Sequence, residues 1–398
     1  MEFDNKSSVL YLTYDGLTDP LGQSQILPYL CGLSKEGYKI TIISFEKKDR
    51  FHEKYNQIKN LCNAHNLNWR PLKYHKAPPV LSTIYDLLKL RITVGFFLKR
   101  NNCDILHCRS YPTSLIGLWA KRKFGVKFIF DMRGFWADER VEGGLWSLKN
   151  PLTFLIYKFF KKKEATFLKE CDSVVSLTTA AKKYLVREFD IPEQKIIVIP
   201  CSVDLDLFDP AKISSVEKSN LQKKLGLSSD DYVLLYLGSL GTWYMYNEMV
   251  EFYEVFKKRN PKAKFLFLTP DQDKVQRRDG FIVATVNRSE VPLYCSIAHA
   301  AIFFIKPSFS KMASSATKLA EVMAMRLEVV TNPGWGDIDE FTKHGLSILL
   351  HKEGAVIELG NTSPLAIDNN RNYILNEMSL KGAISKYLSV YNTLCNKN

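Results

Sequence analysis

The feature that most constrains the fold is an alternation of short apolar strands with helices, which recurs along the chain. Its first occurrence predicts strand 9–14, helix 26–36 and strand 39–45. The same order returns at 105–131 and at 173–199. Strands that alternate with helices in this way form a parallel sheet with helices on both faces. An α/β fold is therefore expected.

A second series of strands and helices follows the charged, strandless stretch 209–231. A chain of 398 residues exceeds the size at which one hydrophobic core keeps growing, so two domains are expected. We predict Rossmann-like domains at 1–205 and 206–375, and a final helix within 376–398 whose apolar side needs a partner surface. Ligands of such sheets bind at the carboxyl ends of the strands, which predicts an active-site cleft between two facing domains.

The net charge of +13, with an isoelectric point near 9.2, favours an anionic partner. A nucleic acid is not expected, because the chain has no Lys/Arg-rich tail, zinc-ligand spacing or aromatic RNA-binding strand. The segment 154–169 mixes aromatic residues with lysines, which predicts reversible docking on an anionic membrane. An internal helix with a solvated lysine edge is the alternative interpretation.

The polar start of the chain and its short apolar runs predict a cytoplasmic protein without a spanning helix, docked at most on the inner face of the cell membrane. The eight cysteines lack Cys-x-x-Cys or His-paired spacing. They are expected to be reduced core residues rather than metal ligands or disulfide partners.

Two loops of the first domain carry candidate chemistry. The loop 15–24 lies between a strand and a helix, where its glycines permit close approach of a phosphate to helix amides. It is not Gly-x-Gly-x-x-Gly, so an NAD-dependent dehydrogenase is not expected. The loop 131–140 combines acids and arginines with aromatic side chains, a composition suited to sugar recognition. A plain capped turn and an ion-paired surface loop are the respective alternatives.

The second domain offers two further anion-binding features. The stretch 238–242 follows an apolar strand and exposes backbone amides. A helix opens at 314–321, with Lys318 at the positive end of its dipole and Glu321 one turn further on. These features predict a nucleotide site in which the helix holds a diphosphate and the carboxylate reaches the ribose. An ordinary helix with a Lys–Glu pair is the alternative.

Together the motifs resemble the retaining glycosyltransferases of family 4, which have the GT-B fold of two facing Rossmann domains. The resemblance covers nearly the whole chain and rests, in order, on 14–25, 107–110, 131–136, 199–204 with Phe208, 317–324 and 332–337. It implies transfer of a sugar from a nucleotide diphosphate donor to a glycan or lipid-linked acceptor in surface polysaccharide or glycoconjugate biosynthesis. It also implies retention of configuration and no metal or other cofactor, and it implies that the final helix within 376–398 packs back on the first domain.

The resemblance implies roles for individual residues. Lys318 and the Thr317 amide would face the diphosphate, and Glu321 would hold the ribose. The catalytic or acceptor-side candidates are Arg133, Asp138, Glu139 and Lys318. The donor-site candidates are Gly16, Gly22, Gln23, Gly238, Ser239, Arg288, Thr317, Lys318, Leu319 and Glu321.

The chain departs from the family pattern at two places. Ser239 and the run 242–245 replace the usual Arg and Lys, so that Lys318 or Arg288 must compensate, and Ala313 lies near the position of the first glutamate of a pair. A nucleotide-sugar epimerase of the same architecture, an inactive regulatory relative and a non-catalytic polyanion-binding protein are the alternatives. The donor base, sugar, acceptor, linkage and oligomeric state are left open.

Overall fold

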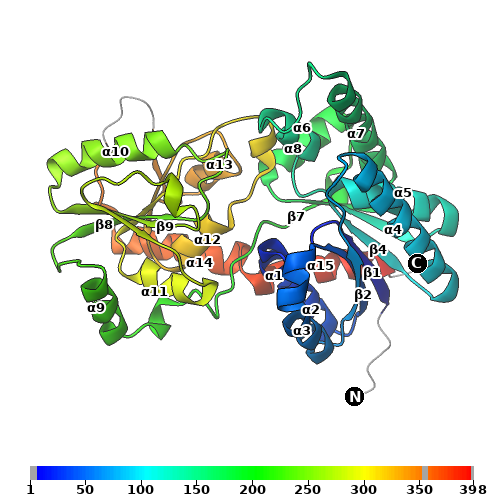
Figure 1. The fold of residues 1–398 in the computed structure, drawn as a ribbon, viewed down its shortest axis with the longest axis horizontal. Helices are drawn as coiled ribbons and strands as arrows, with labels where there is room; N and C mark the ends of the chain where they lie inside the picture. Colours follow the sequence, from blue (N-terminus) through cyan, green and yellow to red (C-terminus); the bar gives the residue numbers. More distant parts are fainter. Residues whose placement is uncertain (1–6, 352–356, 396–398) are drawn as a thin grey trace. The chain divides into compact units, whose positions relative to one another are not determined.

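The structure is a computed structural model that describes residues 7–351 and 357–395. The chain divides into two compact units (Figure 1). Unit 1 comprises Met1–Pro200 and Ala383–Asn398, and unit 2 comprises Cys201–Gly382. Each unit is built around its own parallel sheet, which confirms the α/β architecture expected from the alternating pattern.

The sheet of unit 1 has the order β3-β2-β1-β4-β5-β6-β7. Its strands are β1 (Ser8–Thr13), β2 (Lys39–Glu46), β3 (Asn68–Lys73), β4 (Ile105–Arg109), β5 (Lys127–Asp131), β6 (Ser173–Ser176) and β7 (Ile196–Val198). The helices are α1 (Pro20–Gln25), α2 (Leu27–Lys35), α3 (Lys48–Ala64), α4 (Leu81–Arg100), α5 (Ser110–Phe124), α6 (Trp136–Glu142), α7 (Pro151–Glu170), α8 (Thr179–Phe189) and α15 (Leu380–Cys395). The central strands are buried on both faces, as near-continuous apolar runs in a parallel sheet require.

The sheet of unit 2 has the order β10-β9-β8-β11-β12-β13. Its strands are β8 (Tyr232–Leu237), β9 (Ala263–Leu268), β10 (Phe281–Ala284), β11 (Ala300–Ile302), β12 (Glu328–Thr331) and β13 (Leu349–Leu350). The helices are α9 (Ser215–Lys224), α10 (Tyr246–Arg259), α11 (Val291–Ser296), α12 (Thr317–Ala324), α13 (Ile338–Lys343) and α14 (Pro364–Glu377). The strand order reverses next to β8 here and next to β1 in unit 1, and the carboxyl ends of strands at such points are where ligands of α/β sheets bind.

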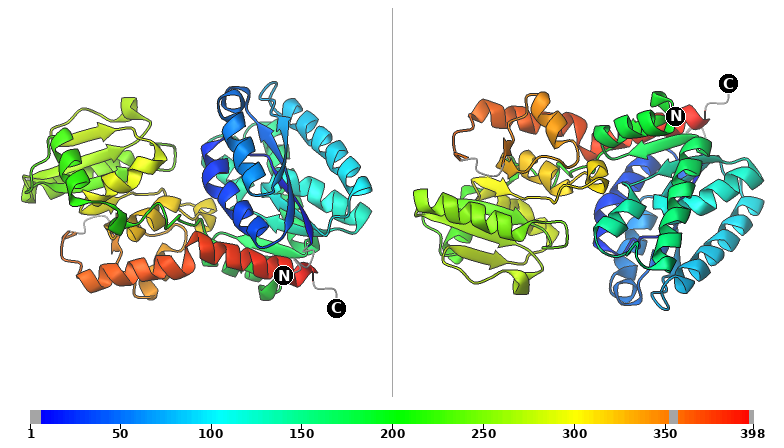
Figure 2. Two further views of the ribbon diagram at one scale, coloured as in Figure 1. Left: turned by 90° about the horizontal axis from the view of Figure 1, so that it is seen from below. Right: turned by 90° about the horizontal axis from the view of Figure 1, so that it is seen from above.

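The last helix, α15, packs on unit 1, as the resemblance implies (Figure 2). The Tyr391 hydroxyl lies 2.8 Å from Nδ1 of His107 on β4, and Tyr38 donates a 2.6 Å hydrogen bond to Asn392. Gly32 of α2 is required by this packing, because a Cβ there would lie 2.2 Å from the Ile384 side chain. The helix α15 therefore contributes to the core of the first unit.

The structure contains α3, β3 and α4 between residues 46 and 104, where the sequence pattern predicted no elements. The helix α4 escapes recognition because its exposed side is apolar as well as its buried side, which removes the usual amphipathic signature. All eight cysteines lie in the described residues, and they are free thiols, six of them buried. This agrees with the expected reduced core residues.

Candidate functional site

Lys318, in the first turn of α12, is the most unusual charged group of unit 2. Its Nζ is buried without a hydrogen-bond partner among the described residues and lies 3.7 Å from the centre of the Tyr244 ring and 5.0 Å from that of Tyr236. Burial lowers the pKa of Lys318 from 10.5 to about 7, although Glu321 opposes the shift. An ammonium group held in this way has donors to offer to an anion.

Gly238 leaves the space that this ammonium group occupies. It follows β8 with a φ of +116°, a conformation that other residues rarely adopt. A Cβ at this position would lie 2.6 Å from the Lys318 Nζ. The neighbouring Ser239 is exposed, and its carbonyl accepts a 2.7 Å hydrogen bond from the Tyr236 hydroxyl. The end of β8 and the start of α12 therefore form one site around Lys318.

Glu321 lies one turn further along α12 and is 4% exposed. Its Oε1 is 2.8 Å from a guanidinium nitrogen of Arg288, whose charged group also lies 5.3 Å from the Phe208 ring centre. Burial raises the pKa of the Glu321 carboxyl, and the positive charges of Arg288 and Lys318 oppose that rise. The structure thus brings the predicted residues Lys318, Glu321 and Arg288 together.

The remaining candidates of unit 2 contribute in different ways. Thr317 begins α12, so its backbone amide belongs to the first turn, where helix amides lack intrahelical acceptors. Leu319 is a core side chain, and its amide donates to the Ala316 carbonyl at 3.0 Å. Tyr236 of β8 and Tyr244 of the segment that follows it were missed as site residues, because an aromatic residue gives no sign in the sequence that a lysine will lie against its ring.

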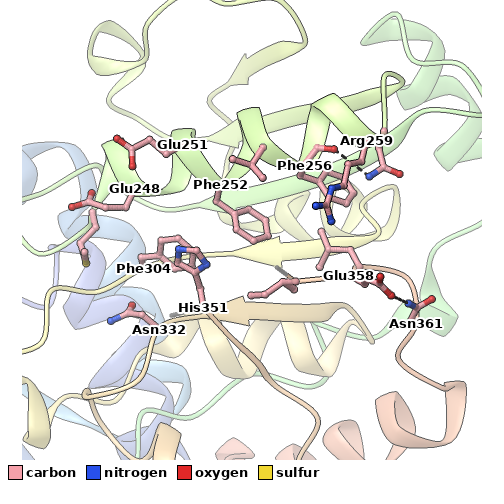
Figure 3. A pocket seen from close by; sticks show the side chains of 15 residues that line it. Glu248, Glu251, Phe252, Phe256, Arg259, Phe304, Asn332, His351, Glu358 and Asn361 are labelled. Atoms are coloured by element: carbon pink, nitrogen blue, oxygen red, sulfur yellow. Dashed lines mark hydrogen bonds between the residues drawn. The ribbon is translucent and has the colours of Figure 1, made fainter. Parts of the chain in front are cut away.

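A separate cavity of about 790 Å³ lies along α10 in unit 2 (Figure 3). Phe252 and Phe304 line it, and the His351 ring stacks on Phe304 with centroids 4.9 Å apart. None of the predicted donor-site residues lines this cavity. We therefore assign it no ligand.

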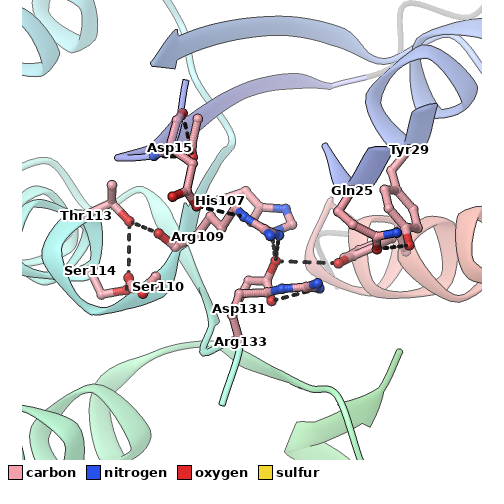
Figure 4. Close-up of polar contacts among 12 residues, drawn as sticks. Asp15, Gln25, Tyr29, His107, Arg109, Ser110, Thr113, Ser114, Asp131 and Arg133 are labelled. Carbon is pink, nitrogen blue, oxygen red and sulfur yellow. Dashed lines mark hydrogen bonds and ion pairs between the residues drawn. The ribbon is translucent and has the colours of Figure 1, made fainter. Parts of the chain in front are cut away.

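In unit 1, a buried cluster of charges surrounds Asp131 at the end of β5 (Figure 4). Its carboxylate lies 3.5 Å from His107 Nε2 and 3.9 Å from a guanidinium nitrogen of each of Arg109 and Arg133. The Tyr387 hydroxyl of α15 donates to it at 3.5 Å. The pKa of Asp131 lies below its ordinary value, so the carboxylate is ionised. Burial alone would raise this pKa, but the effects of Arg133, His107 and Arg109 outweigh burial.

Three arginines gather at this edge of the sheet, close to the carboxylates of Asp131 and Asp15. Arg109 is 3% exposed, and its Nε lies 3.5 Å from the Asp15 carboxylate. Arg133 has a φ of +53°, an uncommon conformation that aims its side chain at Asp131. Arg140 of α6 lies with its guanidinium 4.1 Å from the Trp136 ring centre, and its buried Nε has no hydrogen-bond partner among the described residues. This arrangement can receive an anion.

Several of these residues were absent from the predicted site. His107 and Arg109 belong to motif 107–110 but were given no role, and Arg140 closes the loop 131–140. The signal available in the sequence was the position of His107 and Arg109 at the carboxyl end of β4 and of Arg140 in the segment that follows β5. Burial against α15 lowers the pKa of His107, which keeps this imidazole neutral.

Asp138, by contrast, is occupied by contacts that hold α7 against α6. It accepts hydrogen bonds from the Tyr157 hydroxyl at 2.9 Å and from Lys161 Nζ at 2.8 Å. Lys161 also donates to the buried Glu164 at 2.6 Å, and Glu164 accepts from the Tyr111 hydroxyl. The neighbouring Glu139 is half-buried in the first turn of α6. The geometry gives Asp138 a structural role.

We expect Asp138→Asn to destabilise unit 1 by about 1–2 kcal/mol without changing catalysis, because the amide keeps the shape but loses a charge-assisted bond to Lys161. Denaturant unfolding and steady-state kinetics of the same preparation check this. A large fall in kcat with unchanged stability would return Asp138 to the catalytic residues.

The loop that holds Gly16, Gly22 and Gln23 surrounds an internal carboxylate. Glu46, at the end of β2, accepts hydrogen bonds from the backbone amides of Leu17 at 2.8 Å and Thr18 at 3.1 Å.

Both glycines are required by local packing. A Cβ on Gly16 would lie 2.7 Å from the Glu46 carboxylate, and one on Gly22 would lie 2.1 Å from the Gly16 carbonyl. The Gln23 amide donates to the Thr18 carbonyl at 3.0 Å. The amides of Leu17 and Thr18 therefore bind the chain's own carboxylate, and the approach of Gly16 and Gly22 to a donor phosphate stays a prediction.

Comparison with known proteins matches residues 29–207 to the family model of Glycosyltransferase Family 4. This segment, slightly less than half of the chain, is similar to glycosyltransferase family 4. The family 4 segment lies mostly in unit 1 and includes the Asp131 cluster and the loop 131–140. The resemblance seen in the motifs is confirmed for this part of the chain.

Individual relatives extend the comparison. The chain is 30% identical over 162 residues to the UDP-Gal:alpha-D-GlcNAc-diphosphoundecaprenol alpha-1,3-galactosyltransferase of Escherichia coli, an alignment that covers 40% of this chain and 38% of that protein. A glycosyltransferase from Rickettsia africae has a similar fold, with a TM-score of 0.69, 16% identity and coverage of 99% and 100% of the two chains. Anabaena HepE in complex with UDP and glucose is also similar, with a TM-score of 0.69 and 11% identity. The match covers 97% of this chain and 100% of HepE. These structures share the GT-B fold with the protein.

Proposed function

We propose that the protein transfers a sugar from a nucleotide diphosphate donor to a lipid-linked or glycan acceptor, with retention of configuration and without a metal. The observation that carries this proposal is the buried ammonium group of Lys318 beside Gly238, at the start of α12. A diphosphate placed there would receive the Lys318 charge, the amides of the first helical turn and the Arg288 guanidinium. These groups would stabilise the negative charge that develops when the sugar leaves.

Glu321 supports the same assignment, because a buried carboxylate one turn from the diphosphate can accept hydrogen bonds from two ribose hydroxyls. In the structure it pairs with Arg288, so it also orients that guanidinium. We propose UDP as the nucleotide, since the related galactosyltransferase is named for a UDP-sugar and HepE was solved with UDP. The protein would position the donor and stabilise charge, while the leaving phosphate assists deprotonation of the acceptor hydroxyl.

The acceptor would bind at the arginines of unit 1. Arg109 ends β4, Arg133 follows β5, and Arg140 lies in α6 next to the rings of Trp136 and Trp146. Arginine forks bind phosphates, and indole rings stack on sugars. This composition fits a saccharide joined to a phosphate group, as in the diphosphoundecaprenol acceptor for which the relative is named. We propose that the protein works at the inner face of the cell membrane, in surface polysaccharide or glycoconjugate synthesis.

The test is transfer from a panel of UDP-, GDP-, ADP- and CMP-sugars to a diphospholipid-linked monosaccharide, with products followed by mass spectrometry. We expect an added hexose or related sugar with one donor and retained anomeric configuration by NMR. Addition of a chelator should leave the rate unchanged. Conversion of the donor sugar without any acceptor would instead identify an epimerase.

The matching nucleotide should also stabilise the protein against heat. A ligand present at about 100 times its dissociation constant adds roughly 2.7 kcal/mol of stability, which a thermal-shift assay resolves readily. Absence of a shift with every nucleotide would contradict donor binding in unit 2 and favour the inactive regulatory relative.

A further inference from the structure

The helix α4 of unit 1 presents an apolar stripe to solvent. Six large side chains, each between 48% and 64% exposed, recur at helical spacing along its full length: Leu81, Ile84, Tyr85, Leu88, Ile92 and Phe96. At 3.6 residues per turn they share one side of a helix about 30 Å long. Isolated exposed apolar residues are ordinary, but a contiguous stripe of this size marks an interaction surface.

The opposite side of α4 fixes its orientation. Leu90, Val94 and Phe97 are buried against the core, and Gly95 lies against Trp119 of α5, where a Cβ would be 3.3 Å from the indole. The stripe therefore cannot turn inward without giving up this packing. Basic side chains border it, with Lys89 and Arg91 on its two sides and Lys99 and Arg100 at its end.

The neighbouring helices continue this surface. The helices α4, α5 and α7 lie side by side on one face of the sheet (Figure 1). On α7 the exposed apolar residues are Leu152, Phe154, Leu155 and Phe159. A hollow of about 260 Å³ between α5 and α7 is lined by Arg122, Lys123 and Lys163 beside Trp119.

Acidic groups on these helices are already engaged. Asp86 of α4 is buried and lies 2.6 Å from the His75 imidazole. Glu170 of α7 pairs with Arg122, and Glu164 with Lys161. The outward side of the layer therefore combines apolar side chains with an excess of positive charge.

We infer that α4 lies flat in the headgroup region of an anionic lipid bilayer, with its exposed stripe among the acyl chains and its basic borders on the lipid phosphates. This inference deepens the proposed function, because a lipid-linked acceptor is held in a membrane. A second copy of the chain fits this surface less well, since pairing two such faces would oppose like charges. No helix in residues 7–351 and 357–395 is long and apolar enough to cross a membrane, so contact along the surface is the arrangement that suits this stripe.

The test is cosedimentation of the full chain with vesicles of phosphatidylcholine plus phosphatidylglycerol, compared with phosphatidylcholine alone. We expect binding to the anionic vesicles that weakens as salt is added. The double variant Leu88→Asp, Ile92→Asp should lower the partition coefficient by roughly tenfold or more, because burial of each side chain is lost. The double variant Lys89→Gln, Arg91→Gln should lower it less and reduce the salt dependence.

The matched control is Val216→Asp with Leu365→Asp in unit 2, where the same change is made at side chains 65% and 71% exposed. It should leave vesicle binding unchanged. Equal binding by the wild type and the Leu88 and Ile92 variant would overturn the inference. The inference would also be overturned if light scattering showed a dimer of the wild type that the Leu88 and Ile92 variant dissociates, and neither protein bound vesicles.

Transfer to a short-chain, water-soluble acceptor separates this inference from the proposed function. The Leu88 and Ile92 variant should keep that activity while losing vesicle binding. If the wild type binds vesicles through α4 but transfers no sugar, the proposed function fails and the docking surface stands.

Discussion

Replacing Lys318 by methionine should lower kcat/KM for sugar transfer by about two to three orders of magnitude and raise the stability of the free protein. The loss of activity follows from removing a preorganised cation at the site of developing diphosphate charge. The gain in stability follows because the ammonium group is buried with no hydrogen-bond partner in the described part of the chain, a costly arrangement that the isosteric apolar chain avoids. Kinetics and denaturant unfolding of both proteins measure the two effects.

Stability should also depend on pH through Lys318. The pKa of this group is about 7 in the folded protein and 10.5 in its ordinary state, so the unfolded chain binds more protons between these values. Stability should therefore rise with pH from about 7 to 10.5, and this component of the rise should disappear in Lys318→Met. Below pH 7 the penalty for the charged lysine is fully present. Nucleotide diphosphate binding near neutral pH should take up protons, which calorimetry in buffers of different ionisation enthalpy detects.

The control for this variant is Lys343→Met, which removes an exposed lysine of the same unit that pairs with Glu340. It should leave kinetics unchanged and shift stability little. Unchanged transfer by the Lys318 variant would remove this lysine from the donor site, whatever its effect on stability.

Glu321→Gln should weaken donor binding by about ten- to a hundredfold, with KM taking most of the effect. The amide keeps the shape and helix propensity of the carboxylate but loses its charge and one acceptor oxygen, and hydrogen bonds to charged groups contribute about 1.5–3 kcal/mol each. Dissociation constants measured for UDP and for uridine separate two causes. A loss with both ligands indicates direct contact with the ribose, whereas a loss with UDP alone indicates that Glu321 acts by positioning Arg288.

Glu328→Gln provides the matched control, because Glu328 is another buried carboxylate of unit 2 with structural partners. It accepts hydrogen bonds from the Gly360 amide at 2.9 Å and from the Thr362 hydroxyl. This change should lower stability and leave donor affinity intact. If Glu321→Gln lowers stability and leaves donor affinity unchanged, the carboxylate only pairs with Arg288 inside unit 2 and is no part of the donor site.

The sequence by itself determined the two parallel sheets, the last helix and the helix that begins at Thr317. Each of these depends on periodicity over neighbouring residues, which a strand or helix displays directly in its own segment. The predicted proximity of Lys318 and Glu321 followed in the same way, because residues three apart on a helix share a side. Arg288 was also named in advance, and that prediction rested on the family resemblance. Its contact with Glu321 joins residues 33 positions apart in the chain.

Tertiary structure decided which polar groups are available and which are already used. Gly16 and Asp138 lie in segments whose sequence suits ligand binding. Glu46 nevertheless binds the segment of Gly16, and Lys161 binds Asp138, both from other parts of the chain. Lys318 is a common helix residue until the Tyr244 ring buries its ammonium group and lowers its pKa. The stripe on α4 is visible as a surface only once the opposite side of the helix is known to be buried. Burial and pairing arise between residues far apart in the chain, and for that reason local patterns do not contain them.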